Sequence, residues 1–283
     1  MDNNYEKKGY ELWTEYFDSE KVDIIRKKLD HFFDLNENLG PAVNVSILKD
    51  DELNTYGAQR EDMQRKKKNF FVTKEVLNKG VNFYRNLTNG RSLIDPLLRI
   101  KEIGDLVTDD NILNFVKKNL NEDKIYIGYI KLRRFFNNDI NNFDTNFFHT
   151  DDNSDKILKC IVYIDNILKI EDGPFVYVEG SHEKKFKNVN NLNEYSRTDQ
   201  EIENFYSTDN IKPLYGRKGT LLFANTLGYH KGIKPKSKDR YALYINYVCK
   251  EEYDGKGEKQ KVSKKLLEKY PEKSNLFEFF QKI

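Results

Sequence analysis

Apolar residues recur at helical spacing in two early segments of the chain. In residues 18–34 they recur every three or four positions, which predicts an amphipathic helix capped by Asp18 or Ser19. A second helix is predicted over 108–120, because acidic residues open this segment and lysines close it, as the helix dipole favours. We therefore expect residues 1–124 to be mainly helical.

From about residue 125 the pattern changes to short, β-rich apolar runs separated by turn residues. Many such runs with few helices between them are typical of a sandwich or barrel. We expect one domain over 1–283, mainly β with helical layers. Its core, at about 125–250, would be a double-stranded β-helix (jelly roll, cupin-like), and the helical tail 251–283 would be broken near Pro271. The predicted strands are 41–48, 125–136, 147–151, 157–165, 175–180, 219–225 and 240–248.

Charge and composition exclude several classes of partner. The 283 residues include 48 basic and 46 acidic side chains, so the net charge of +2 gives no electrostatic footprint for nucleic acid or a membrane. The basic run at 65–68 is interpreted as a solvated face. Cys160 and Cys249 lie in apolar runs and are expected to be buried free thiols. With no apolar leader or span in view, we expect a cytoplasmic monomer or homodimer acting on a small molecule.

The motif FFHTDD carries the first candidate chemistry. His149 and Asp151 are two positions apart, so on an extended strand they would point to the same side. His230 follows a later predicted strand. Two imidazoles and one carboxylate can occupy one face of an octahedron and leave three positions open, as in non-haem Fe(II) oxygenases. A structural zinc site would need a fourth protein ligand. The alternative is a strand-end histidine bonded to a turn aspartate.

Arg240 opens the last predicted strand, ten residues after His230. If it points into the barrel, Ala242, Tyr244 and Asn246 point inward with it. A buried guanidinium needs an anionic partner, and a diacid co-substrate would supply one. The alternative is a surface salt bridge with Asp239 or with an acid of the tail.

These motifs occur in a recognisable order. HTD comes first, then GPFVYVEGSH, then GTLLFANTLGYHKG, and then the arginine ten residues beyond His230. This order resembles the phytanoyl-CoA dioxygenase family of Fe(II)/2-oxoglutarate-dependent oxygenases. The segment 86–120 also resembles the helical region that precedes the barrel in that family, so the resemblance extends from about residue 85 to 248.

The resemblance implies a ligand set and a reaction. His149, Asp151 and His230 would bind Fe(II), and Arg240 would pair with the distal carboxylate of 2-oxoglutarate, with dioxygen as the oxidant. Related halogenases have glycine or alanine where this chain has Asp151. The carboxylate therefore favours hydroxylation of an unactivated C–H bond of a metabolite, in biosynthesis for example, with release of succinate and CO2.

One position departs from the family pattern. Many relatives carry a hydroxyl residue two positions after the second histidine, where it helps to hold the co-substrate. This chain has Gly232 there, so the hydrogen bond would be missing or replaced. Tyr244, Tyr129 and Lys131 are the candidates to replace it.

Other features have more than one interpretation. His182 is interpreted as a structural residue that bonds backbone or shapes the entrance, and Asp152 as a less favoured ligand because it would face away from Asp151. The polar insert 183–213 is either a functional lid or a surface excursion. Two rival functions remain open: a non-catalytic jelly-roll binding protein, and a cupin-type metalloenzyme that does not use 2-oxoglutarate.

Overall fold

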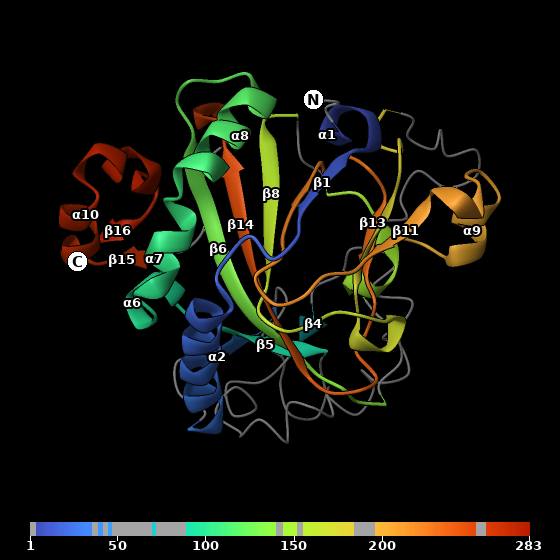
Figure 1. Cartoon of the computed structure of the whole chain (residues 1–283), viewed down its shortest axis with the longest axis horizontal. Helices are drawn as coiled ribbons and strands as arrows, with labels where there is room; N and C mark the ends of the chain where they lie inside the picture. Colours follow the sequence, from blue (N-terminus) through green and yellow to red (C-terminus); the bar gives the residue numbers. More distant parts are fainter. Residues whose placement is uncertain are drawn as a thin grey trace.

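The computed structural model consists of two antiparallel sheets with helices packed around them (Figure 1). The structure describes residues 4–35, 39–41, 45–46, 70–71, 89–139, 144–151, 155–183, 196–252 and 259–283. The predicted strand at 41–48 is described in part, as the last residue of one strand and two residues of another. The basic run at 65–68 lies outside the described residues.

The larger sheet has seven strands in the order β1-β12-β8-β14-β6-β5-β2. Its longest strands, β6 and β14, pair along nearly their whole length, with one bulge after Asn246. The strands are β1 (Tyr10–Trp13), β2 (Leu39–Pro41), β5 (Gly90–Leu93), β6 (Tyr126–Phe135), β8 (Ile157–Tyr163), β12 (Leu221–Ala224) and β14 (Arg240–Val248).

The smaller sheet has five strands in the order β10-β7-β13-β9-β11. It brings together segments that are far apart in the sequence, since β7 pairs with both β13 and β10. Its strands are β7 (Phe148–His149), β9 (Phe175–Val178), β10 (Ser196–Arg197), β11 (Ile211–Leu214) and β13 (His230–Gly232).

The remaining elements are mostly helical. The longest helices are α2, which begins after the predicted cap Asp18, and α8, which is capped by Asp109. The helices are α1 (Asn4–Lys8), α2 (Ser19–Asp34), α6 (Pro96–Arg99), α7 (Glu102–Val107), α8 (Asp110–Leu120), α9 (Asp199–Glu203) and α10 (Lys264–Lys269), with 3-10 turns η2 (Asp144–Asn146), η3 (Ile170–Asp172), η4 (Thr208–Asn210), η5 (Lys250–Glu252) and η6 (Pro271–Phe277). Two small pairs complete the list: β3 (Val45–Ser46) with β4 (Phe70–Phe71), and β15 (Lys261–Val262) with β16 (Gln281–Lys282).

The expectation that residues 1–124 are mainly helical is incomplete. This region also supplies β1, β2 and β5, which all join the larger sheet. The three strands have only three or four residues each, too few for a period-two pattern to be distinguished from a helical one. Their pairing partners, β12 for β1 and β6 for β5, come from the later part of the chain. The tail likewise contains β15 and β16 beside its helices, and Pro271 begins η6.

A helical layer covers the outer face of the larger sheet (Figure 1). Tyr241, Leu243, Ile245 and Tyr247 of β14 alternate along this face, and all four side chains are fully buried. They share one core with the apolar faces of α2, α7 and α8. This packing holds β14 and its neighbours in a fixed register.

A second core lies between the two sheets. Ile161, Tyr163 and Leu222 of the larger sheet pack with Phe175 and Tyr177 of the smaller one. These residues occupy the strand positions opposite in parity to those facing the helices. The inward faces of the two sheets therefore enclose the space in which the candidate site residues meet.

The described part of the polar insert 183–213 is not a structureless loop. Its second half forms β10, α9, η4 and β11, and Ile202 of α9 packs against Phe148 and Val178 on the outer face of the smaller sheet. Residues 184–195 lie outside the described residues. The lid function therefore remains a prediction for that part of the insert.

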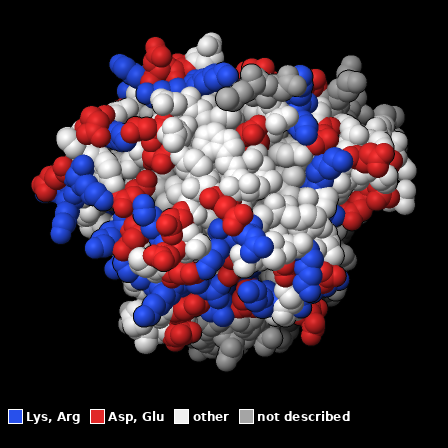
Figure 2. All heavy atoms as spheres, viewed as in Figure 1, with Lys and Arg blue, Asp and Glu red and all other residues white. Residues whose placement is uncertain are grey.

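The surface agrees with the near-neutral charge. On the face shown in Figure 2, basic and acidic side chains are interspersed around an uncharged area. Cys160 and Cys249 are both buried free thiols, as expected. Among the helices that the structure describes, none has the length and hydropathy required to cross a bilayer.

Candidate metal centre

Two histidines meet across neighbouring strands of the smaller sheet. In the register of β7 and β13, His149 lies directly opposite His230, so both side chains leave the sheet on the same side. Each residue is 2% exposed, and the centroids of the two rings are 4.3 Å apart. Residues 81 positions apart in the sequence are therefore juxtaposed by strand pairing.

Backbone carbonyls orient both imidazoles. The Nδ1 atom of His149 lies 2.9 Å from the carbonyl oxygen of Phe147, and Nδ1 of His230 lies 2.9 Å from that of Gly228. A carbonyl oxygen only accepts, so each Nδ1 donates its hydrogen, and in a neutral ring this arrangement leaves the Nε2 lone pair for a metal. The ring of Phe175 also stacks on that of His230, with centroids 5.3 Å apart. Both Nε2 atoms are thus prepared as metal ligands.

Asp151 completes the cluster. Its Oδ1 atom lies 3.8 Å from Nε2 of His149 and 3.9 Å from Nε2 of His230. Its backbone N–H donates to the carbonyl oxygen of Thr226 at 2.9 Å, which anchors the segment after β7 to the segment before β13. One ligand atom from each of the three residues lies within 4.8 Å of the others, as a single metal ion requires.

A lysine in the site was missed by the sequence analysis. Lys159, in β8, is 8% exposed, and its Nζ donates to Oδ2 of Asp151. Burial alone would raise the pKa of Asp151, but the Lys159 ammonium and the two neighbouring histidines together outweigh it and hold the pKa well below its usual range. Burial lowers the pKa of His230 to about 3, so its imidazole is neutral. The available signal was a lysine in the middle of the otherwise apolar run ILKCIVYI.

Arg240 is buried and points toward the space between the sheets. It is 3% exposed, and its guanidinium carbon lies 4.0 Å from the centroid of the Phe135 ring. Asp239, the neighbour considered as its partner, instead accepts a hydrogen bond from Nε of Arg134 at 2.7 Å. In the part of the chain that the structure describes, no acid forms an ion pair with Arg240, and its buried Nε has no hydrogen-bond partner.

Gly232 lies beside this guanidinium. A Cβ atom built on Gly232 would be 3.8 Å from Nη2 of Arg240 and 3.8 Å from the carbonyl oxygen of Thr145, which is ordinary van der Waals contact. The position therefore has room for a small side chain next to Arg240. Steric crowding therefore does not explain why this position lacks a hydroxyl side chain.

The three candidates to replace that hydroxyl lie at different distances along the larger sheet. Tyr244 faces Lys131 across β14 and β6, and its ring centroid is 6.1 Å from that of Phe135, on which Arg240 stacks. Tyr129 instead shares a cross-strand row with Asn246 and Lys159, at the Asp151 end of the sheet. The structure thus places Tyr244 nearer to Arg240, and Tyr129 nearer to the histidine-aspartate cluster.

His182 is not part of this cluster. The Nε2 atom of His182 lies 2.9 Å from the carbonyl oxygen of Glu6, which agrees with its interpretation as a backbone-bonding residue. Asp152 lies outside the described residues.

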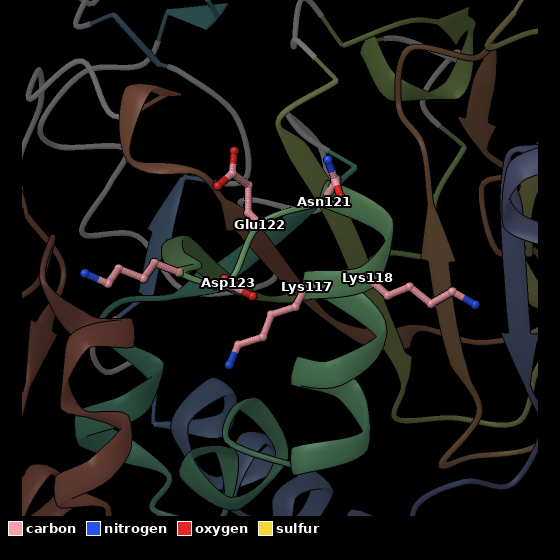
Figure 3. Close-up of a pocket in the computed structure, with 6 residues that line it drawn as sticks. Lys117, Lys118, Asn121, Glu122 and Asp123 are labelled. Carbon is pink, nitrogen blue, oxygen red and sulfur yellow. The ribbon is translucent and has the colours of Figure 1, made fainter.

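A surface hollow at the C-terminal end of α8 is lined by charged and polar residues, and Figure 3 shows that the labelled side chains point in different directions. That hollow has none of the convergence expected of a binding site.

The fold is similar to that of several solved structures. No protein-family model matches the chain, and no curated protein matches it. Solved structures do match. HygX from Streptomyces hygroscopicus, with nickel and 2-oxoglutarate bound, has a TM-score of 0.55 at 14% identity over 87% of this chain and 85% of HygX. The epimerase SnoN, in complex with Fe3+, alpha ketoglutarate and nogalamycin RO, has a TM-score of 0.57 at 12% identity over 87% of this chain and 80% of SnoN.

A third match widens the range of reactions among the neighbours. The non-heme alpha ketoglutarate dependent carbocyclase SnoK, from nogalamycin biosynthesis, has a TM-score of 0.54 at 11% identity over 87% of this chain and 81% of SnoK. The identities are too low to carry an activity from any of these proteins to this one, but the coverage is high on both sides. The chain therefore shares its fold with HygX, SnoN and SnoK.

Proposed function

We propose that this protein is an Fe(II)- and 2-oxoglutarate-dependent oxygenase that hydroxylates a C–H bond of a small-molecule metabolite and releases succinate and CO2. The observation that carries the proposal is the convergence of His149, Asp151 and His230 beside a buried Arg240 that has no carboxylate partner among the described residues. The proposal includes a jelly-roll topology and membership of the phytanoyl-CoA dioxygenase family, which the motif order resembles.

The three side chains fit ferrous iron as a donor set. Two imidazoles and one carboxylate suit Fe(II), and no fourth His, Cys, Asp or Glu joins the cluster among the described residues. His149, Asp151 and His230 would hold the ion. With 2-oxoglutarate and dioxygen, the ion would supply the chemistry in which one oxygen atom enters succinate, as the keto acid loses CO2, and the other enters a substrate C–H bond.

Arg240 fits the distal carboxylate of 2-oxoglutarate. Burying a guanidinium without an anion is energetically costly, and Nε of Arg240 has no partner among the described residues while the group stacks on Phe135. HygX and SnoN, which share the fold, were both solved with this keto acid bound. Arg240 would hold the diacid by charge-assisted hydrogen bonds and orient its other end toward the metal ligands.

The protein's own residues hold the reactants and exclude water. The Phe147 and Gly228 carbonyls keep both Nε2 atoms turned toward the metal position. Phe175, Tyr163 and other residues of the core between the sheets give the site apolar walls. Halogenases of the family that the motif order resembles have glycine or alanine where this chain has Asp151, so the carboxylate favours hydroxylation over halogenation. Such orientation and water exclusion are the main contributions of a protein to cofactor-driven chemistry.

The test is the turnover of 2-oxoglutarate. We expect protein reconstituted anaerobically with Fe(II) to form succinate when 2-oxoglutarate and air are added, and to form more when a panel of small metabolites includes a substrate. Mass spectrometry of that substrate then distinguishes an added oxygen atom from the epimerised or cyclised products that the names of SnoN and SnoK indicate. His230→Ala, which lacks a ligand, is the matched control.

The same assay separates the rival functions. A non-catalytic binding protein and a metalloenzyme that does not use the keto acid would form no succinate under any condition. A wild-type protein that binds metal but neither binds nor decarboxylates 2-oxoglutarate would therefore disprove the proposal.

A further inference from the structure

Lys159 is unusual in its surroundings. It lies in the middle of β8, between two other strands of the larger sheet, and is 8% exposed. Its neighbours across the sheet are Ala224 in β12 and Asn246 in β14, so its side chain leaves the sheet on the inward face. A lysine buried this deeply requires an anionic partner.

That partner is one oxygen of Asp151. Nζ of Lys159 donates to Oδ2, whereas Oδ1 faces Nε2 of His149 and of His230 at 3.8 and 3.9 Å. The two carboxylate oxygens thus have different environments: one is held by an ammonium, and the other points toward the two imidazoles. The ammonium has no acceptor, so it cannot itself be a metal ligand.

We propose that Lys159 is a positioning residue that keeps Asp151 bound to the metal through Oδ1 alone. The inference rests on the proposed metal site. A carboxylate that binds a metal through one oxygen leaves three positions of an octahedron open beside two histidines, and 2-oxoglutarate with dioxygen needs all three. A carboxylate that binds through both oxygens would take one of these positions. By occupying Oδ2, Lys159 keeps the third position available.

The direct test is the coordination of nickel, which binds without turnover. We expect a crystal structure of the nickel-loaded wild-type protein to show one oxygen of Asp151 on the metal and the other on Nζ of Lys159. In Lys159→Met the second oxygen is released and should also bind nickel. Lys159→Arg, which keeps a charged donor, should restore binding through one oxygen. Wild-type nickel bound by both oxygens, or a Lys159 displaced from Asp151, would overturn the proposal even if the variants failed to fold.

Calorimetry provides the solution counterpart. Lys159→Met should bind nickel at least as tightly as the wild type, because a nearby positive charge is gone. The affinity of the nickel-loaded variant for 2-oxoglutarate should be lower than that of the wild type by about tenfold or more. A misfolded site would instead lose both affinities. The matched control is Lys156→Met, since Lys156 pairs with Glu122 at a half-exposed position just before β8 and should change neither affinity.

The outcomes separate this inference from the proposed function. If the wild-type protein binds nickel but not 2-oxoglutarate, the proposed function fails, while the nickel structures still decide the role of Lys159. If the keto acid binds and only its affinity changes in Lys159→Met, with Asp151 still bound through one oxygen, Lys159 acts through its charge alone and the positioning role is wrong.

Discussion

The two faces of the larger sheet have opposite chemistry although the same strands build both. On the outer face, Tyr241, Leu243 and Ile245 of β14 are fully buried against the helices. On the inner face, Arg240 and Asn246 of the same strand are buried too, but each keeps a polar atom with no hydrogen-bond partner among the described residues. Along β14, the polar atoms of the outward side chains are paired within the protein, whereas two of the inward side chains keep buried polar atoms that have no such partner among the described residues.

Two arginines on neighbouring strands make this contrast specific. Arg134 lies opposite Tyr241 in the register of β6 and β14, and its Nε donates to Asp239. Arg240 lies opposite Phe135, one position along, and no carboxylate among the described residues pairs with it. A shift of one residue along a strand moves a side chain to the other face. The same residue type therefore has a carboxylate partner on one face and none among the described residues on the other.

The largest expected effect is the loss of the metal site. His149→Ala and His230→Ala should each abolish nickel binding and turnover, because two ligands no longer define one face of the coordination sphere. Their free energy of unfolding should change little, since the site is not part of the helix-facing core. Calorimetry and urea denaturation measure the two quantities, and His31→Ala on α2 is the control. Metal affinity that survived in both variants would contradict the assignment.

On the outer face, a substitution is expected to reduce folding stability strongly and to leave ligand binding unchanged. Leu243→Ala should lower the free energy of unfolding by about 3 kcal/mol, because it leaves a cavity among fully buried side chains. Nickel and 2-oxoglutarate affinities should stay near the wild-type values while the protein remains folded. Urea denaturation measures the first and calorimetry the others. A loss of stability below about 1 kcal/mol would show that the two faces differ less than their packing indicates.

Arg240→Ala should affect binding more than folding. We expect its 2-oxoglutarate affinity to fall about 10- to 100-fold, which corresponds to the roughly 1.5–3 kcal/mol of hydrogen bonds to a charged group. Nickel affinity should be retained. The matched variant Arg134→Ala should lower the free energy of unfolding and leave 2-oxoglutarate binding unchanged, because Arg134 forms an ion pair with Asp239 on the other face. Equal effects of the two substitutions on the keto acid would remove the contrast.

The smallest expected effect is a gain. Gly232→Ser adds a hydroxyl beside Arg240 in space that accepts a Cβ. One additional hydrogen bond is worth about 1 kcal/mol, so the affinity for 2-oxoglutarate should rise about fivefold. Gly232→Ala, which fills the same space without a donor, separates the hydrogen bond from the added bulk. If both variants bind the keto acid more weakly, the space beside Arg240 is already occupied by the bound co-substrate.

The elements that were correctly predicted are those with long periodic patterns. Strand β14 has the predicted bounds, and α2 begins after the predicted cap. The three cluster residues were also proposed from the sequence, because the chain has only four histidines and one of them lies two positions before Asp151. Short elements such as β1 and β5 were missed, because four residues carry too little pattern and their pairing partners lie far away in the sequence.

The sequence by itself determined which faces of the long strands are apolar and which side chains are able to bind a metal, because residue type and local period are properties of the chain. Only the tertiary structure decided that His149 lies opposite His230, that Asp239 pairs with Arg134, and that Lys159 meets Asp151. Such contacts depend on register and on packing between sheets, which are set by residues distant in the sequence.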